Sequence, residues 1–542
     1  MAAVLALIPI ALLLASAGVA ASETRRGWVR VLPTAFAWLA LAAFVGAWAA
    51  TRAVQEFALG GTQAGIPLSL RLDAVSFAFG FAAVLSAAIV VSLSRGRGAE
   101  LATAALTAAA ILVAIDAGSL IFAAVAIGAA ITFFVLALDV AAGPLRWFQW
   151  LPLAAVPLML AGAAAAMEVT GGTNEFAAIP VVALRVPAFL LVAGAGLILA
   201  GAVPGAAALN RLAGPSAVSA LASVAFPVAG IYLLVRLYEI GDGRYPAAWL
   251  NAVVVGAGLL AAIAAALRAQ AAPSLRDVLA ESVPALSGFG VIAAALGTRA
   301  GIVAAVTCAL TAAASLALVV VADTGWRPAA RLLTLVACAG LPPALTFGAR
   351  LLVLQAGLEA GEPQGLVALV AGLAWLLWLA GVSRAMSLPA ARPAARRHSP
   401  GIVTVAAAVV AVGAGLGWMA MLAGDPAAAE VMPAQVPSLA GGAAAVLVTR
   451  SGAIAALTLG GPVLLLLGLA TWAGRGRRLR QVPAVVPPVL DWRWTPASSG
   501  IRLLRRGFTV PALLPRLEVV LAEEHPVFWV AVVAVLALVV LR

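Results

Sequence analysis

The chain has 542 residues, of which 64% are hydrophobic and only 10% are charged. A membrane-spanning helix needs about 20 apolar residues, and such stretches recur along the whole chain. This composition excludes a set of soluble domains and predicts an all-α polytopic membrane protein. The net charge of +12 is assigned to arginines that set topology in cytoplasmic loops, not to nucleic-acid binding.

All 33 basic residues are arginines. A buried lysine can lose its proton, whereas arginine effectively cannot, so the sequence excludes a proton relay built on lysines. Cys308, Cys338, His398 and His525 show no metal-ligand spacing. We therefore expect no metal, haem or iron–sulfur cofactor and no catalytic residue on this chain.

Apolar stretches predict about 14–16 transmembrane helices. The candidate spans cover residues 3–20, 33–51, 74–94, 101–117, 119–138, 149–167, 184–203, 214–237, 246–267, 277–297, 301–321, 332–356, 364–383, 401–422, 447–472 and 525–541.

Charges alternate between the predicted loops. Arginines follow the odd-numbered spans, and acidic residues such as Glu168, Glu359 and Glu430 follow even-numbered ones. Because positive loops stay in the cytoplasm, we expect both termini outside and a multi-pass protein of the bacterial inner (cytoplasmic) membrane.

Two polar segments stand out between the spans. Residues 60–73 alternate like a short strand before the third span. Residues 475–524 mix Arg with Leu and Val at near-helical spacing, which is typical of a segment that lies on the membrane or docks a neighbouring subunit. A solvated linker is the alternative reading of this insert.

The stretch from Gly214 to Arg236 contains helix-breaking signals. Gly-Pro opens it, Ser216 and Ser219 follow, and Pro227 interrupts its middle. Broken helices inside a membrane need protein or a wet cavity to satisfy the freed backbone groups. The pattern predicts a polar axis here, where Asn210, Ser216 and Ser219 either organise water or satisfy the backbone.

Four phrases in the sequence occur in a recognisable order. They are LDxxS at Asp73–Ser76, GPxxVSAL from Gly214, SLRDVLAES at Ser274–Ser282, and GLPPALTFGARLLVLQ at Gly340–Gln355. Over about residues 70–400, their order resembles the antiporter-like proton-translocating subunits of respiratory complex I, Mrp antiporters and group 4 membrane-bound hydrogenases. The last phrase and the tail at Trp494–Phe508 resemble the large antiporter-like subunit of the hydrogenase-4 and formate hydrogenlyase type.

The resemblance implies a domain organisation. Two inverted five-helix repeats, 73–240 and 241–400, would each contain a broken helix, near Pro204 (198–215) and Pro342 (340–348). The remaining divisions are N-terminal helices with a short extracytoplasmic loop at 1–72, C-terminal helices at 401–474, and an Arg-rich cytoplasmic or surface segment with a terminal transmembrane helix at 475–542.

The resemblance also places the family's proton path. Its Glu on the fifth helix falls on Gly128, its lysine at the first break on Ile198 or Leu199, and its next lysine on Val228. The Lys or Glu at the second break falls on Arg350. A proton wire needs groups that titrate at working pH or an unbroken water chain, so we expect an inactive or strongly altered path.

Some charges could belong to a relict of that path. Arg350 is either a fixed charge on the old axis or an arginine that binds carbonyls freed by a helix break. Arg276, Asp277 and Glu281 form either an entry funnel or a charge cluster at a helix start.

The leading expectation is a non-catalytic membrane subunit of a complex I-like or group 4 hydrogenase-like complex, with a mainly structural and coupling role. Its expected partners are other membrane and peripheral subunits and the lipid bilayer, with no nucleic acid. The alternative is an ion-coupled transporter subunit, either Mrp-like or a partner in inorganic-carbon uptake.

Overall fold

A computed structural model divides the chain into two units, Met1–Val486 and Pro487–Arg542. The residues that it describes all lie in the first unit. They are 2–22, 31–59, 68–94, 98–142, 152–172, 174–176, 178–179, 186–202, 217–241, 243, 245–272, 275–321, 337–338, 340, 345–360, 365–385 and 423–432. The predicted spans 401–422, 447–472 and 525–541 and the insert 475–524 lie outside these residues.

Helices account for nearly all of the described secondary structure. They are α1 (Ala2–Ala21), α2 (Leu32–Thr51), α3 (Ala74–Leu93), α4 (Gly98–Ile115), α5 (Leu120–Ala142), α6 (Ala155–Thr170), α7 (Val186–Leu199), α9 (Ala217–Ile240), α10 (Ala248–Ala271), α11 (Leu275–Ala295), α12 (Arg299–Val321), α14 (Leu345–Glu359) and α15 (Gly365–Ala385), and a further helix covers residues 423–431. Within the described residues, 8 helices are long and apolar enough to cross a membrane. The all-α, multi-pass class is therefore confirmed, whereas the inverted repeats stay a prediction.

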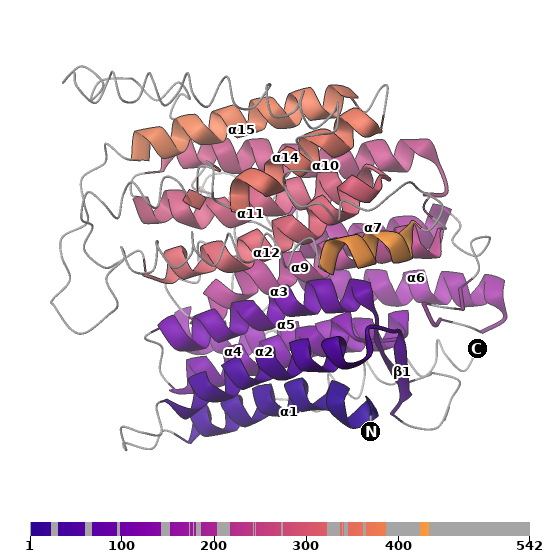
Figure 1. The fold of residues 1–542 in the computed structure, drawn as a ribbon, viewed down its shortest axis with the longest axis vertical. Helices are drawn as coiled ribbons and strands as arrows, with labels where there is room; N and C mark the ends of the chain where they lie inside the picture. The colour runs from indigo at the N-terminus through magenta and orange to yellow at the C-terminus, as the bar shows by residue number, and fades with distance from the viewer. Residues whose placement is uncertain are drawn as a thin grey trace, which may run out of the picture. The chain divides into compact units, whose positions relative to one another are not determined.

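The most deeply buried helices lie inside the bundle. The apolar stretch of α3 is 100% buried inside the protein, and the apolar stretches of α9 and α12 are each 94% buried. Figure 1 shows them between flanking helices that include α1 and α15. By contrast, the apolar stretch of α6 is only 28% buried, as expected for a helix at the outside of the bundle.

Helix α7 ends inside the protein. It has 14 residues, about 21 Å at 1.5 Å per residue, which is too short for a hydrocarbon core of about 30 Å. Gly201 adopts φ 73°, and the Ala202 amide donates to the Leu197 carbonyl at 2.9 Å, which is a Schellman ending. Ala202 is buried, so the chain leaves the helix within the bundle, where the sequence places the first break.

The predicted span 332–356 contains an interruption, where the sequence places the second break. Residues 337–338 are helical, Gly340 has φ 74°, and α14 begins only at Leu345. A left-handed residue cannot continue a right-handed helix, and glycine adopts this conformation without steric cost. Residues 203–216 and 341–344, which include Pro204 and Pro342, lie outside the described part.

Pro227 does not interrupt its helix, contrary to the expectation from sequence. Helix α9 runs from Ala217 to Ile240 with Pro227 inside it. Proline removes one hydrogen bond of the helix, but a membrane helix tolerates this loss where neighbouring helices enclose it. The burial of α9 on nearly all sides provides that enclosure.

A short hairpin precedes α3. Strand β1 (Gln55–Ala58) pairs antiparallel with β2 (Ser69–Leu72), with Glu56 opposite Arg71. The expected strand within 60–73 is confirmed as β2, and its partner β1 was not predicted. The other edge of β2 pairs with the α4–α5 connection, where the Arg71 amide donates to the Asp116 carbonyl at 2.6 Å.

Candidate functional site

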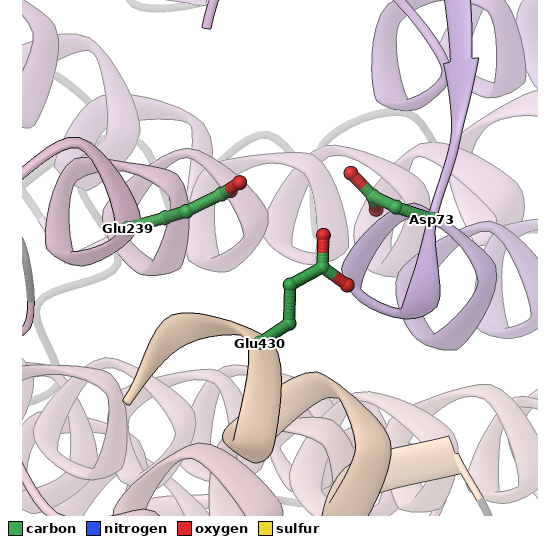
Figure 2. Close-up of side chains that lie close together, drawn as sticks. All are labelled: Asp73, Glu239 and Glu430. Carbon is green, nitrogen blue, oxygen red and sulfur yellow. The ribbon is translucent and has the colours of Figure 1, made fainter. Parts of the chain in front are cut away.

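An ion-pair network joins segments that are far apart in the sequence. We call it the Asp73 cluster, and its members are Arg71 of β2, Asp73 before α3, Arg236 and Glu239 of α9, and Glu430 of the helix over residues 423–431. Figure 2 shows the three carboxylates of the cluster converging from three separate segments.

Asp73 is fixed by the start of α3. Its carboxylate accepts a hydrogen bond from the Ser76 amide at 2.8 Å, and the Ser76 hydroxyl accepts one from the Asp73 amide at 2.8 Å. This capping box satisfies two backbone donors at the helix start, and it explains the spacing of the LDxxS phrase in physical terms. The phrase therefore has a structural role as well as a place in the cluster.

Arg236 is the buried centre of the network, with 1% of its surface exposed. Its guanidinium donates to both carboxylate oxygens of Asp73, each at 2.7 Å, and also to Glu239. Its Nε donates to the Tyr232 hydroxyl at 3.0 Å, and the ring of Phe176 lies 5.8 Å away. Such charge-assisted contacts, with each guanidinium nitrogen of Arg236 directed to a partner, hold the group strongly in one place.

Arg71 connects the three carboxylates. Its Nε lies 2.9 Å from Asp73, and its Nη2 lies 2.9 Å from Glu239 and 3.3 Å from Glu430. Glu430 also accepts a hydrogen bond from the amide of Ala74, at the start of α3, at 3.0 Å. The helix over residues 423–431 is thereby attached to β2 and α3.

Burial and charge act in opposite directions on the acids of this region. Burial alone would raise the pKa of Asp73, but Arg236 and Arg71 outweigh it and hold that pKa below the ordinary value. Burial and the charge of Asp73 raise the pKa of Asp116 well above its ordinary value. Burial, followed by Asp73, raises the pKa of Glu430 to about 7. Glu430 therefore titrates near neutral pH.

The three carboxylates are close enough to hold a metal ion. Oxygens of Asp73, Glu239 and Glu430 all lie within 4.8 Å of one another. However, the guanidinium groups of Arg71 and Arg236 already lie among them and supply positive charge. We therefore assign the group to an ion-pair network and not to a metal centre.

Gly128, Leu199 and Val228, at which the resemblance leads us to expect ionisable groups, lie in apolar surroundings. Leu199 and Val228 are buried, and a Cβ added to Gly128 would meet only Val156 side-chain atoms, at 3.6 Å and beyond. Helices α7 and α9 contact through glycine. A Cβ on Gly230 would lie 2.4 Å from the Gly196 carbonyl oxygen.

Arg350 lies beside the turn at Gly340. A Cβ on that glycine would lie 2.3 Å from Arg350 Nη1. The guanidinium carbon is 5.5 Å from the centre of the Trp375 ring and 5.8 Å from that of Phe289. Stacking of this kind favours a cation in an apolar setting.

The backbone carbonyls of Ala337 and Cys338, just before Gly340, accept hydrogen bonds from side chains. The Thr346 hydroxyl donates to the Ala337 carbonyl at 2.8 Å, and the Trp378 indole donates to the Cys338 carbonyl at 2.9 Å. Backbone groups near the second predicted break are therefore satisfied by side chains of α14 and α15.

The other predicted site residues lie in different surroundings. Glu281 is buried and pairs with Arg268 of α10 at 3.0 Å, so this carboxylate ties α10 to α11. Asp277 is exposed, and Ser219 is buried in α9. Asn210, Ser216 and the side chain of Arg276 lie outside what the structure describes.

The Asp73 cluster was not predicted as a site. Its members are up to 359 residues apart. In the sequence, Asp73 belongs to the LDxxS phrase, Arg236 ends the stretch that begins at Gly214, and Glu430 was read as a loop acid. One signal was available: the charge alternation predicts that Asp73, Arg236 and Glu430 all lie on the same side of the membrane. Charges that share one predicted side could have been examined as a group.

Comparisons with known proteins find similar folds among solved structures. No family model matches the chain, and no curated protein matches it. A chain of the Mrp complex from Dietzia sp. DQ12-45-1b is similar with a TM-score of 0.67 and 20% identity, over 99% of this chain and 63% of that one. This chain thus spans less than two thirds of that Mrp chain.

Two further structures show the same likeness. A chain of respiratory complex I from Thermus thermophilus with bound NADH gives a TM-score of 0.64 and 19% identity, over 80% of this chain and 99% of that one. A chain of the membrane-bound sulfane sulfur reductase, an archaeal respiratory membrane complex, gives a TM-score of 0.62 and 16% identity, over 89% of this chain and 86% of that one. This chain therefore has the fold of membrane chains from these three multi-subunit complexes.

Proposed function

We propose that this chain is an antiporter-like membrane subunit of a complex I-like or group 4 hydrogenase-like energy-converting complex. Its own proton path is inactive, and its role is to hold partner subunits together and to couple them. The hydrogenase-4 type is the proposed branch, on the basis of the GLPP phrase from Gly340 and the tail at Trp494–Phe508.

The close contact between Gly196 and Gly230 is the observation that carries this proposal. A proton path needs titratable groups or connected water. Where the family resemblance puts two lysines, this chain has apolar side chains: the half-buried Ile198 or the buried Leu199 at the first position, and the buried Val228 at the second. The helices that carry them meet at backbone distance, which leaves no space for a water chain between α7 and α9 at this level.

Arg350 fits the same proposal. It retains a positive charge at the second predicted break, held between Trp375 and Phe289. Arginine holds its proton at any working pH, so this residue supplies a fixed charge that stabilises the interior and does not hand a proton onward.

Proton uptake by liposomes tests the proposal. The purified chain is reconstituted with an internal pH-sensitive dye, and an imposed potential drives protons inward. We expect the rate of empty liposomes, while an intact Mrp antiporter complex in parallel liposomes gives a clear signal. Uptake well above the empty control, removed by Arg350→Gln, would contradict an inactive path.

A second candidate is an ion-coupled transporter subunit, Mrp-like or a partner in inorganic-carbon uptake. The likeness to the Mrp chain over 99% of this chain favours it. Purification from native membranes separates the two candidates. Copurifying redox subunits support the first proposal, whereas a two-protein complex with a zinc-containing cytoplasmic subunit supports the second.

A further inference from the structure

In the Asp73 cluster the carboxylates outnumber the guanidinium groups. Asp73 and Glu239 each contact both arginines, Arg71 and Arg236. Glu430 contacts Arg71 at 3.3 Å, the longest ion pair of the cluster. After the two arginines have neutralised two acids, Glu430 is the carboxylate that remains without a full counter-charge.

Glu430 is also placed where it can exchange a proton with water. Its side chain is 19% exposed, whereas those of Asp73 and Arg236 are 0% and 1% exposed. The negative charges of Asp73 and Glu239 disfavour its ionised form, and Arg236 and Arg71 favour it. The Ala74 amide at the start of α3 also favours the ionised form.

We propose that Glu430 carries an exchangeable proton at this end of the bundle, and that loss of the proton loosens the helix over residues 423–431. Ionised Glu430 leaves a surplus negative charge beside Asp73 and Glu239 in a partly buried site, where like charges repel strongly. The protonated form relieves this repulsion and still accepts the hydrogen bond from Ala74.

The same helix has anchors that do not involve this proton. Asp425 lies 3.6 Å from Arg299 of α12, and Gly424 packs against Val303. Met432 lies close to Gly243. Because these contacts persist, we expect local loosening and not release of the segment. The proposal is independent of the inactive path, since it concerns a group outside the membrane-spanning helices.

Infrared difference spectroscopy of the purified full chain tests the proton directly. A protonated carboxyl group has a carbonyl stretch that vanishes on ionisation. We expect one glutamate band to disappear with a midpoint near neutral pH, and this band to be absent in Glu430→Gln. The control Asp425→Asn, on the same helix, keeps the band. Labelling glutamate or aspartate with ¹³C assigns the band in the wild type even if the variant fails to fold.

Hydrogen–deuterium exchange of the peptide around residues 423–432 tests the loosening. The wild type is compared with Glu430→Gln at each pH, so that the intrinsic pH dependence of exchange cancels. We expect equal exchange in acid and faster exchange in the wild type above neutral pH, with no difference in peptides of α9. Equal exchange of the two proteins at all pH values would overturn the proposed loosening.

Two spectroscopic outcomes would overturn the proton site. One is a glutamate band that titrates only in the ordinary acidic range or that survives in Glu430→Gln. The other is a midpoint that shifts when sodium chloride replaces choline chloride at equal ionic strength, because a metal cation would then occupy the site in place of the proton.

Discussion

Arg236 of α9 binds both carboxylate oxygens of Asp73, each at 2.7 Å, across 163 residues of sequence. The contact joins the last turns of α9 to the cap of α3, and both groups are buried. Removing one partner of a buried ion pair destabilises a protein more than replacing both partners by apolar residues, because the remaining charge stays buried without its partner.

The first prediction concerns this pair. Arg236→Met should destabilise the protein by about 3–5 kcal/mol, because Asp73 is then buried with one guanidinium fewer. Asp73→Asn serves as the matched control, since Asn still caps a helix but removes the negative charge. Combined with Arg236→Met, it should recover part of the loss. Thermal unfolding in detergent, followed by tryptophan fluorescence, measures this; additive effects would contradict the coupling.

The second prediction concerns the contact of α7 with α9. Gly230→Ala would place a methyl group 2.4 Å from backbone atoms of Gly196 and Ala200. Backbone cannot move aside cheaply, so we expect a loss of about 1–3 kcal/mol or more. The control is Gly256→Ala in α10, where a Cβ meets nothing within 4 Å; it should be neutral or gain up to about 1 kcal/mol. Equal effects of the two substitutions would refute the close approach.

The third prediction concerns the turn beside Arg350. Gly340 has φ 74°, and its Cβ would lie 2.3 Å from the Arg350 guanidinium. Gly340→Ala should cost about 1–2 kcal/mol through the left-handed backbone, and more if Arg350 must move. Gly348→Ala in α14, which meets nothing within 4 Å, is the matched control. The melting temperatures of the Gly340→Ala and Gly348→Ala proteins test this prediction. A Gly340→Ala protein as stable as the Gly348→Ala control would contradict the left-handed turn at Gly340.

The fourth prediction concerns stability and pH. The folded pKa of Glu430 is raised to about 7 from its ordinary 4.5. The folded state therefore holds this proton more tightly, and the associated stability is lost as pH rises from about 4.5 through 7. Glu430→Gln should abolish this slope. Asp73 has a lowered pKa, so its contribution is present above about pH 4 and disappears only in stronger acid. Melting temperatures across this range, measured on the wild type and Glu430→Gln, test the signs.

Local sequence patterns predicted the helices well, because apolar length alone determines where a chain crosses a bilayer. The strand β2 was recognised by its alternation, but β1, with 4 residues, is too short to give a pattern. Pro227 was misread because a proline ends a helix only where nothing encloses it. Glu430 was read as a loop acid, whereas it lies in a helix.

The Asp73 cluster could not be predicted from local patterns. Capping at Asp73 and Ser76 is a local property, but the LDxxS phrase was read as part of the family resemblance and not as a helix cap. The partners Arg236 and Glu430 reach Asp73 and Arg71 only through the packing of α3, α9 and the helix over residues 423–431. No spacing rule in a single sequence links positions so far apart. The alternation of loop charges indicated only that these residues lie on the same side of the membrane.

Thiol accessibility in the middle of the bundle tests the central claim most directly, namely that the axis between α7 and α9 is dry. Cysteines are placed at Leu199 and Val228, with Ala58→Cys at the exposed end of β1 as the positive control and the buried native Cys308 and Cys338 as background. In native membranes, a small charged thiol reagent should label position 58 only. Labelling at 199 or 228 at a rate near that of the control would mean that water reaches the axis, and it would contradict the loss of the proton path.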